Sequence, residues 1–360
     1  SRECVFFQTK FPPLYNVRTT RDGSWIKAIG NFFLKVIFYI LMIKFLLDVI
    51  TFKYFKVVFA TRKVKKLIET IAQSDIFFIV GGGYLTESTL SRLLDTSMLI
   101  FAARLLNVKC VMSGQTIGHM SHNLNRLILG RALACCSIMS TRDPLDSMKS
   151  AETLLSGKSE PELLFTSDDA LLLTSSTLDE KYAGYIGIQL HFWGVNNEET
   201  ILKFYQDIVD YLIDNISDKI VIFPMHHSDL VPALKLKTLR PQLEVYQYNF
   251  EVEQIVNFIH SLKMVISMKH HPLIFAFGGI VPAISINYSE YYRHKNEGAM
   301  RNFGFEKFSF VCDERALEDI KVSISEIIMD EARLKFLIKD KLFHAKNRRE
   351  LFWKKVKKLA

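Results

Sequence analysis

Short apolar runs that alternate with helix-like stretches constrain this chain more than any other feature. Residues 75–80 (DIFFIV), 109–113 (KCVMS) and 137–141 (SIMST) have the length and composition of buried strands. A helix-like stretch at residues 88–106 separates the first two. Strand, helix and strand at this spacing imply βαβ units, in which the strands are parallel and share one sheet.

A second series of the same kind follows the polar stretch at residues 174–181. Its strand-like runs are 185–190, 219–224, 243–246, 264–268 and 283–287, and helix-like stretches at 198–215, 252–262 and 272–277 separate most of them. We therefore predict an α/β chain with two Rossmann-like, doubly wound parallel-sheet domains that face each other across a cleft. The predicted ranges are residues 1–175 and 176–345, followed by a basic amphipathic helix at 346–360.

Composition limits the class of partner. The chain has 360 residues and a formal net charge of +8, which favours anionic partners. It contains no RNA-recognition signature, zinc-finger spacing or basic repeat, so we expect no nucleic-acid partner. The five cysteines lack metal-site spacing and suggest a reduced, cytoplasmic protein without a metal. The sequence as given shows no signal-peptide pattern.

An apolar stretch at residues 32–50 raises the question of a membrane. Lys35, Lys44 and Asp48 interrupt it, which favours a membrane-surface helix or a buried core helix over a transmembrane span. The surface and core alternatives both stay open.

The C-terminal residues suggest a membrane surface too. Phe352, Val356 and Leu359 share one helical face, and lysines cover the rest, which is the pattern of a basic interfacial helix. We expect attachment to anionic lipid at the inner face of the cell membrane. A terminal helix docked on the protein core is the alternative.

Polar residues follow the strands of the first series. Gly81, Gly82 and Gly83 could bring the backbone close to an anion at a helix N-terminus, or could simply form a tight turn. The next two strand ends carry Gln115, His119 and the pair Arg142-Asp143. The structural alternatives are a hydrogen-bonded loop histidine and a local ion pair.

Histidines and cations follow the strands of the second series. His226-His227 and Lys269-His270-His271 each come directly after a strand, and Pro272 favours a helix start. A lysine and a histidine at a helix N-terminus can bind an anion and move a proton near neutral pH. Arg293 and Lys295, in a predicted loop at residues 288–295, would add positive charge.

The ordered set of motifs resembles the polysaccharide pyruvyl transferase family. The matching elements are Gly81-Gly82-Gly83, Gly114-Gln115-Thr116-Ile117-Gly118, Arg142-Asp143, Asp168-Asp169-Ala170, Ser267-Met268-Lys269-His270-His271 and residues 288–295. Lys269 stands where the family usually has arginine, and an early Asn-x-Gly-Asp-Glu loop is absent.

The resemblance implies a two-Rossmann GT-B enzyme that moves pyruvate from phosphoenolpyruvate onto two hydroxyls of a sugar, forming a cyclic ketal without a metal or cofactor. Acceptors of this kind occur in exopolysaccharide or capsule synthesis and include undecaprenyl-pyrophosphate-linked sugars. We predict His271 and His227 as the catalytic residues, with His119 as an alternative to His227. The predicted phosphoenolpyruvate ligands are Lys269, Lys295, Ser267 and Arg293. The predicted acceptor or cleft residues are Gly81, Gly82, Gly83, Glu87, Gln115, His119, His191 and Arg142.

Two other functions stay open at this point. One is a GT-B glycosyltransferase with a nucleotide-sugar donor, although the second domain lacks a clear Glu-x6-Glu element after a glycine-rich loop. The other is a non-catalytic module that binds anions or glycans. The sequence does not identify the sugar, the hydroxyl pair or the ketal stereochemistry, and it leaves a homo-oligomer open.

Overall fold

The computed structural model describes residues 25–59, 61–118, 120–157, 161–175, 177–195, 197–217 and 219–359, with the side chains of residues 25–35, 38 and 291 left out. His119, one of the predicted cleft residues, lies outside the described residues. The chain divides into two compact units, residues 1–44 and 45–360. The second unit contains both sheets and all of the residues discussed below as a site.

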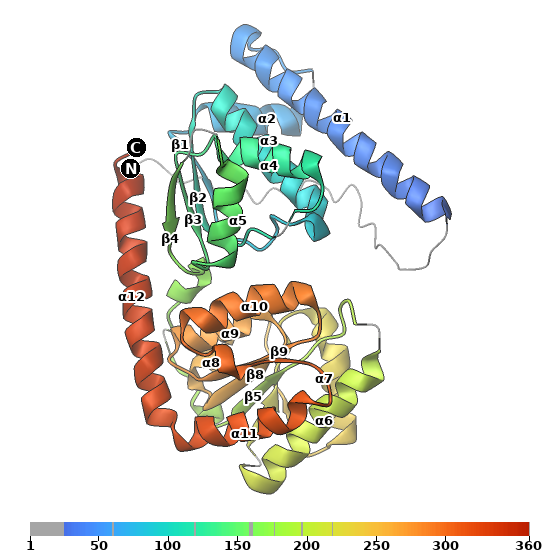
Figure 1. Ribbon diagram of the computed structural model, residues 1–360, viewed down its shortest axis with the longest axis vertical. Coiled ribbons are helices and arrows are strands. Elements are labelled where there is room, and N and C mark those ends of the chain that lie inside the picture. The colour runs from blue at the N-terminus through green and yellow to red at the C-terminus, as the bar shows by residue number, and fades with distance from the viewer. Residues whose placement is uncertain are drawn as a thin grey trace. The chain divides into compact units, whose positions relative to one another are not determined.

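The first sheet has four parallel strands in chain order: β1 (Ile76–Ile79), β2 (Lys109–Gln115), β3 (Ile138–Thr141) and β4 (Glu162–Phe165). Helices α3 (Leu90–Leu105), α4 (Asn123–Leu133) and α5 (Asp146–Leu155) connect them (Figure 1). These elements confirm the predicted βαβ series. The connections bring the carboxyl ends of all four strands to one edge of the sheet.

The second sheet has six parallel strands in the order β10-β9-β8-β5-β6-β7. The strands are β5 (Ile186–Gln189), β6 (Ile220–Ile222), β7 (Glu244–Val245), β8 (Met264–Ser267), β9 (Ala283–Asn287) and β10 (Ser309–Val311). The helices are α6 (Glu198–Asn215), α7 (Leu230–Leu239), α8 (Val252–Ser261), α9 (His270–Gly278), α10 (Glu290–Asn302) and α11 (Ala316–Met329). The strand order reverses between β5 and β8. In doubly wound sheets a ligand crevice opens at such a switch point.

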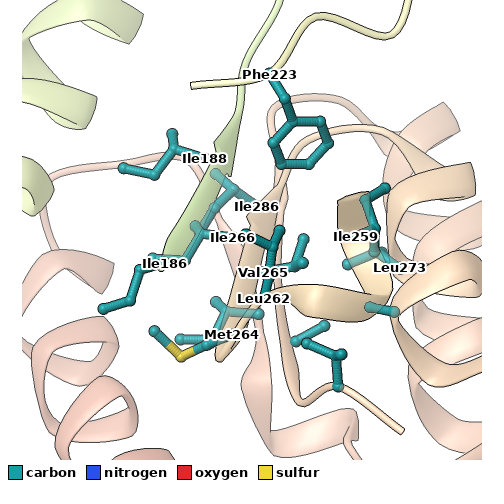
Figure 2. Packing of buried hydrophobic residues seen from close by; sticks show 14 of the residues in the cluster. Ile186, Ile188, Phe223, Ile259, Leu262, Met264, Val265, Ile266, Leu273 and Ile286 are labelled. Atoms are coloured by element: carbon teal, nitrogen blue, oxygen red, sulfur yellow. The ribbon is translucent and has the colours of Figure 1, made fainter. Parts of the chain in front are cut away.

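Apolar side chains on both faces of the second sheet form the main core. Ile186 and Ile188 of β5 lie beside Val265 and Ile266 of β8, and Phe223 packs nearby (Figure 2). All five are fully buried, and each such side chain contributes about 1.5–3 kcal/mol to folding. Because helices cover both faces, these strands are apolar throughout rather than alternating.

The C-terminal helix corrects the prediction of a separate membrane-facing helix at residues 346–360. Helix α12 (Glu331–Lys357) begins much earlier, and its first half buries Leu334 and Ile338 in the core of the second sheet. Its second half buries Phe352 and Val356 against Val111 of β2 and neighbouring residues of the first sheet. The docked alternative is therefore correct, because the apolar face that could enter a membrane is already covered by protein.

The apolar stretch at residues 32–50 lies within helix α1 (Trp25–Phe55), and helix α2 (Arg62–Ala72) follows it. In the described part of the chain, no helix combines the length and apolarity needed to cross a membrane. Phe45 and Val49 of this stretch are buried, whereas Leu47 and Ile50 are exposed.

Candidate active site

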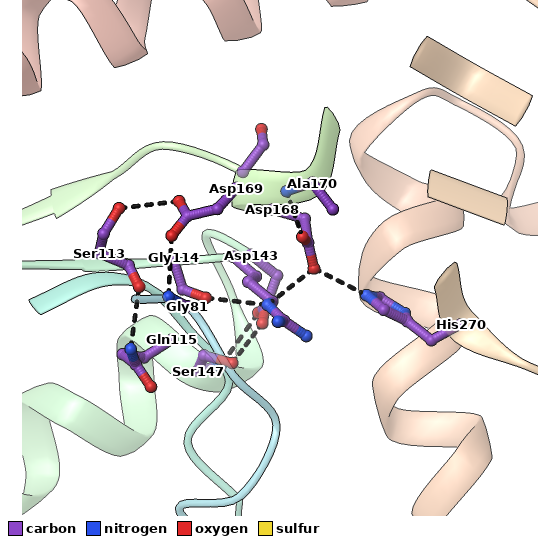
Figure 3. Close-up of polar contacts among 12 residues, drawn as sticks. Gly81, Ser113, Gly114, Gln115, Asp143, Ser147, Asp168, Asp169, Ala170 and His270 are labelled. Carbon is purple, nitrogen blue, oxygen red and sulfur yellow. Dashed lines mark hydrogen bonds and ion pairs between the residues drawn. The ribbon is translucent and has the colours of Figure 1, made fainter. Parts of the chain in front are cut away.

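A buried ion-pair cluster joins the loops of the two sheets around Asp168 (Figure 3). Asp168 follows β4, and its Oδ2 accepts from Arg142 Nε at 2.8 Å and from His270 Nε2 at 3.0 Å. Its Oδ1 accepts from the Ala170 backbone N–H at 2.9 Å. All three charged or polar side chains are buried. Burial of the carboxylate is tolerable because each of its oxygens has a donor.

Protonation states follow from this geometry. Burial opposes ionisation of Asp168, but Arg142 and His270 outweigh it and hold the pKa of Asp168 well below its ordinary value. Burial lowers the pKa of His270 to about 3, although Asp168 opposes that shift. At neutral pH the pair is therefore a carboxylate and a neutral imidazole that donates through Nε2. His270 Nδ1 is then a buried acceptor, without a hydrogen-bond partner among the described residues.

The cluster lines a small pocket that also contains Lys295 and His294 of α10. Arg142 Nη1 is buried there and has no hydrogen-bond partner within the described ranges. Burial, followed by the positive charge of Arg142, lowers the pKa of Lys295 to about 8. Two cations, Arg142 and Lys295, and two carboxylates, Asp143 and Asp168, line this desolvated space. Arg142 Nη1, unpartnered among the described residues, and the lysine ammonium are the groups in it that suit an anionic ligand.

Gly83 of the glycine loop lies beside Lys295. A Cβ atom at Gly83 would come within 2.9 Å of Lys295 Cε and 3.2 Å of its Nζ. The missing side chain therefore leaves room for the ammonium group. Lys295 lies on helix α10, which begins at Glu290, so the loop predicted for residues 288–295 is mostly helical.

His271 lies in the first turn of α9 and is exposed. Its ring packs against His270, with 5.7 Å between centroids, and against Phe275, with 6.0 Å. Desolvation by the surrounding protein lowers the pKa of His271 to about 4; Asp168 opposes this shift, and Lys295 and Arg142 add to it. His271 therefore belongs to the electrostatic environment of the pocket, although its ring remains accessible.

Lys269 and Ser267, predicted to bind phosphoenolpyruvate, bind other protein side chains. The Lys269 ammonium lies 2.7 and 2.5 Å from the two carboxylate oxygens of buried Asp229. Ser267 Oγ donates to Gln189 Oε1 at 3.1 Å and is also buried. Sequence reasoning missed Asp229, whose signal is its position two residues after His227, near the end of a strand.

His191 lies where the strand order reverses, after β5. Its Nδ1 accepts from the Trp193 backbone N–H at 3.1 Å, and its buried Nε2 has no hydrogen-bond partner in the described part of the chain. Burial, and next the charge of Lys269, lowers the pKa of His191 to about 4. The ring packs against Tyr288 and Tyr292, with centroids 5.4 and 5.0 Å away. Nearby Trp193 is 63% exposed.

The first two glycines of the loop have structural roles. Gly81 N–H donates to Asp169 Oδ2 at 2.8 Å, and a Cβ there would lie 2.6 Å from the Gly114 carbonyl oxygen (Figure 3). Gly82 accepts from Thr116 N–H at 2.8 Å through its carbonyl. Both glycines thus bind protein groups through their backbone, and a 3-10 turn (Glu87–Thr89) precedes helix α3.

Gln115 and Glu87, predicted to contact the acceptor, hold protein segments together. Gln115 is buried and donates to the Val80 carbonyl at 3.0 Å. Glu87 accepts from Ser121, from His122 N–H at 2.8 Å and from Asn125 Nδ2 at 3.1 Å, next to the start of α4. We attribute structural roles to both residues in this state.

His227 and Arg293 lie outside the pocket. His227 is exposed after β6 and packs on Phe250, with 4.0 Å between ring centroids. Strands β8 and β6 are separated by β5, so their ends are about 10 Å apart. Arg293 pairs with Glu290 at 2.9 Å and approaches Glu297 at 3.7 Å, both on its own helix.

The Arg142-Asp143 pair separates into two roles. Both residues line the pocket, but Arg142 pairs with Asp168, whereas Asp143 accepts from Ser147 N–H at 2.9 Å at the start of α5. Asn302 of α10, which sequence reasoning missed, donates to the Arg142 carbonyl at 2.7 Å. The structure thus brings Arg142 and Lys295 together with Asp168 and His270.

Comparisons with known proteins identify a family and a fold. The family model for polysaccharide pyruvyl transferase matches residues 14–290, which is more than half of the chain. No curated protein matches the sequence.

Two solved structures show the same fold. UDP-GlcNAc 2-epimerase from Neisseria meningitidis bound to UDP-GlcNAc has 12% identity and a TM-score of 0.53, over 84% of each chain. A putative UDP-N-acetylglucosamine 2-epimerase from Listeria monocytogenes has 11% identity and a TM-score of 0.53, over 78% of this chain and 75% of that one. At this identity the likeness concerns the fold alone, which is the GT-B arrangement of two Rossmann-like halves.

Proposed function

This chain belongs to the polysaccharide pyruvyl transferase family, and from that membership we propose that it transfers pyruvate from phosphoenolpyruvate to two hydroxyls of a sugar. The products are a cyclic pyruvate ketal and inorganic phosphate. The observation that carries the proposal is the pocket in which Arg142 and Lys295 lie close to His270, with His271 coupled to both cations electrostatically.

Phosphoenolpyruvate carries a phosphate and a carboxylate, so its site needs cations and hydrogen-bond donors. Arg142 offers a buried Nη1 without a partner in the described residues, and Lys295 offers an ammonium beside Gly83. We assign the donor to these two side chains. Lys269 is not a donor ligand in this proposal, because both oxygens of Asp229 bind its ammonium group and it does not line the pocket.

The proposed chemistry uses His271 as acid and then as base. Protonated His271 gives its proton to the methylene carbon of phosphoenolpyruvate, which leaves an oxocarbenium-like centre at the adjacent carbon. The first sugar hydroxyl attacks that centre and returns a proton to His271. The carbon–oxygen bond to phosphate then breaks, the second hydroxyl attacks, and its proton leaves with the phosphate. No metal takes part.

Donor binding prepares His271 for the first step. With a pKa of about 4, the ring is neutral at pH 7 in the unliganded protein, because of desolvation and the cations nearby. A bound dianion offsets the charges of Lys295 and Arg142 and raises the pKa of His271. His270 and Asp168 are positioning residues, since Asp168 holds both His270 and Arg142 in place.

The acceptor sugar is assigned to the aromatic residues after β5. Trp193 is exposed, and its loop is held by His191 Nδ1 and by the Tyr288 hydroxyl, which donates to the Trp193 carbonyl. Aromatic rings of this kind can stack on the apolar face of a sugar. Tyr292 and Lys295 are three residues apart on α10 and share a face, so this surface borders the donor pocket.

A single assay tests the proposed function. Purified protein is incubated with phosphoenolpyruvate and a panel of sugar acceptors, including undecaprenyl-pyrophosphate-linked ones, and phosphate release is measured together with the mass of the product. We expect phosphate and ketal in equal amounts. Thermal-shift screening with UDP-, GDP- and CMP-sugars runs in parallel. Stabilisation by a nucleotide sugar but not by phosphoenolpyruvate would support a glycosyltransferase instead.

A further inference from the structure

Helix α1 has apolar residues on the side that faces away from the core. Within the unit of residues 45–360, Phe45, Val49 and Phe52 are buried, whereas Leu47 and Ile50 are exposed. Helices on a protein surface usually have polar residues on the outward side. A helix that is apolar on both sides therefore exposes a second apolar surface, which a partner can cover.

The exposed apolar surface widens at the end of the helix. Tyr54, Phe55 and Phe59 are 70%, 74% and 78% exposed, and Val57 between them is exposed as well. Lys56 takes a left-handed turn with φ 59°, and Phe59 N–H donates to Asp48 Oδ1 at 3.1 Å. That hydrogen bond holds Phe59 near the helix end. We call Leu47, Ile50, Tyr54, Phe55, Val57 and Phe59 the corner patch.

The charges around the corner patch have one sign. Residues 45–66 contain six basic side chains and a single acidic one, Asp48, which is buried. The basic residues are Lys53, Lys56, Arg62, Lys63, Lys65 and Lys66, and all except Lys53 are exposed. Lys65 approaches Glu69 of its own helix at 3.8 Å, a weak surface contact.

We propose that the corner patch docks on an anionic lipid bilayer. Exposed aromatic side chains flanked by lysines suit the boundary between headgroups and acyl chains, where apolar rings enter and cations meet lipid phosphates. Charge complementarity selects this occupant. A second copy of the chain would bring six more basic residues to the same surface, and the two copies would repel each other.

The membrane contact proposed here lies at the corner patch and not on the C-terminal helix. The apolar face of α12 is buried against the first sheet, whereas the corner patch is open. The contact is also independent of the donor pocket, because no residue of the corner patch lines that pocket.

Vesicle co-sedimentation of the full chain tests the inference. Vesicles contain either phosphatidylcholine alone or phosphatidylcholine with phosphatidylglycerol. We expect binding to the phosphatidylglycerol vesicles, weaker binding in high salt, and little binding to phosphatidylcholine alone. Phe55→Glu/Phe59→Glu should reduce binding about tenfold or more, and Lys63→Glu/Lys66→Glu should reduce it as well.

The matched control is Phe336→Glu/Phe343→Glu, which makes the same change at two exposed phenylalanines of α12. It should bind vesicles like the wild type. Equal binding by the Phe55/Phe59 variant, or equal binding to neutral vesicles, would overturn the proposal. So would a wild-type dimer in light scattering that the Phe55/Phe59 variant converts to monomer. Far-UV circular dichroism and thermal unfolding verify that each variant is folded.

Discussion

At the scale of single residues, the lowered pKa of Lys295 predicts a pH limit for donor binding. Burial and Arg142 lower that pKa to about 8, and only the protonated amine attracts an anion. As the pH rises through about 8, Lys295 loses its proton and the KM for phosphoenolpyruvate should rise. Steady-state kinetics from pH 6 to about 9 measure this limb.

Lys295→Arg is the informative variant, because arginine stays protonated over this range. Its KM should be less dependent on pH above 8 than the wild-type value. A wild-type KM that does not change between about pH 7 and 9 would contradict the role given to Lys295.

His271→Ala should lower turnover by roughly 100-fold or more, since general acid–base groups contribute about that much. The fold should persist, because the side chain is exposed. The control is His227→Ala, which changes another exposed histidine on the same sheet edge. The turnover numbers of both variants test this role, and thermal unfolding verifies that each variant is folded. Near-normal turnover without His271 would remove it from the mechanism.

At the scale of elements, helix α12 should be essential for stability. Phe352 is fully buried against β2 and β3, and its ring meets Trp353 edge to face, so Phe352→Ala should cost about 3–5 kcal/mol in the free energy of unfolding. Phe343→Ala on the exposed side of the same helix should cost within about 0.5 kcal/mol. Urea unfolding measures both; equal effects would mean that the docked half of the helix adds little.

The carboxylate at the start of α4 makes a second prediction at this scale. Burial would raise the pKa of Glu87, but hydrogen bonds from Ser121, His122 and Asn125 outweigh it and lower the pKa from 4.5 to about 2. Because the folded pKa is depressed, the stabilisation is present above pH 4.5 and is lost as the pH falls toward 2. Glu87→Gln should therefore flatten the acid side of the stability curve between these values. An unchanged slope would contradict the contribution of these hydrogen bonds.

Local sequence predicted the elements well but the site only in part. The apolar runs revealed nearly every strand, because buried parallel strands need no alternation. Pairings between distant segments left no local signal. Asp229 neutralises Lys269, Asp169 binds Gly81 N–H, and α12 covers the first sheet. Each pairing depends on how the strands are ordered, which a single sequence does not specify.

At the scale of the whole molecule, loops from both sheets form the proposed donor pocket. Arg142 and Asp168 follow strands of the first sheet, and His270 and Lys295 follow strands of the second. Helix α12 packs on both cores and so links the two halves. Asp168→Ala would leave Arg142 buried without its carboxylate, and should cost about 3–5 kcal/mol in the free energy of unfolding.

Calorimetric titration of phosphoenolpyruvate at pH 7 tests the central claim most directly. In buffers with different ionisation enthalpies, the wild type should bind with proton uptake, because the bound dianion raises the pKa values of His271 and Lys295. Lys295→Met should bind at least about tenfold more weakly. Arg293→Met, which removes a cation from the same helix outside the pocket, should bind like the wild type. Equal affinity in all three proteins, or no binding of phosphoenolpyruvate by the wild type, would contradict the proposed function.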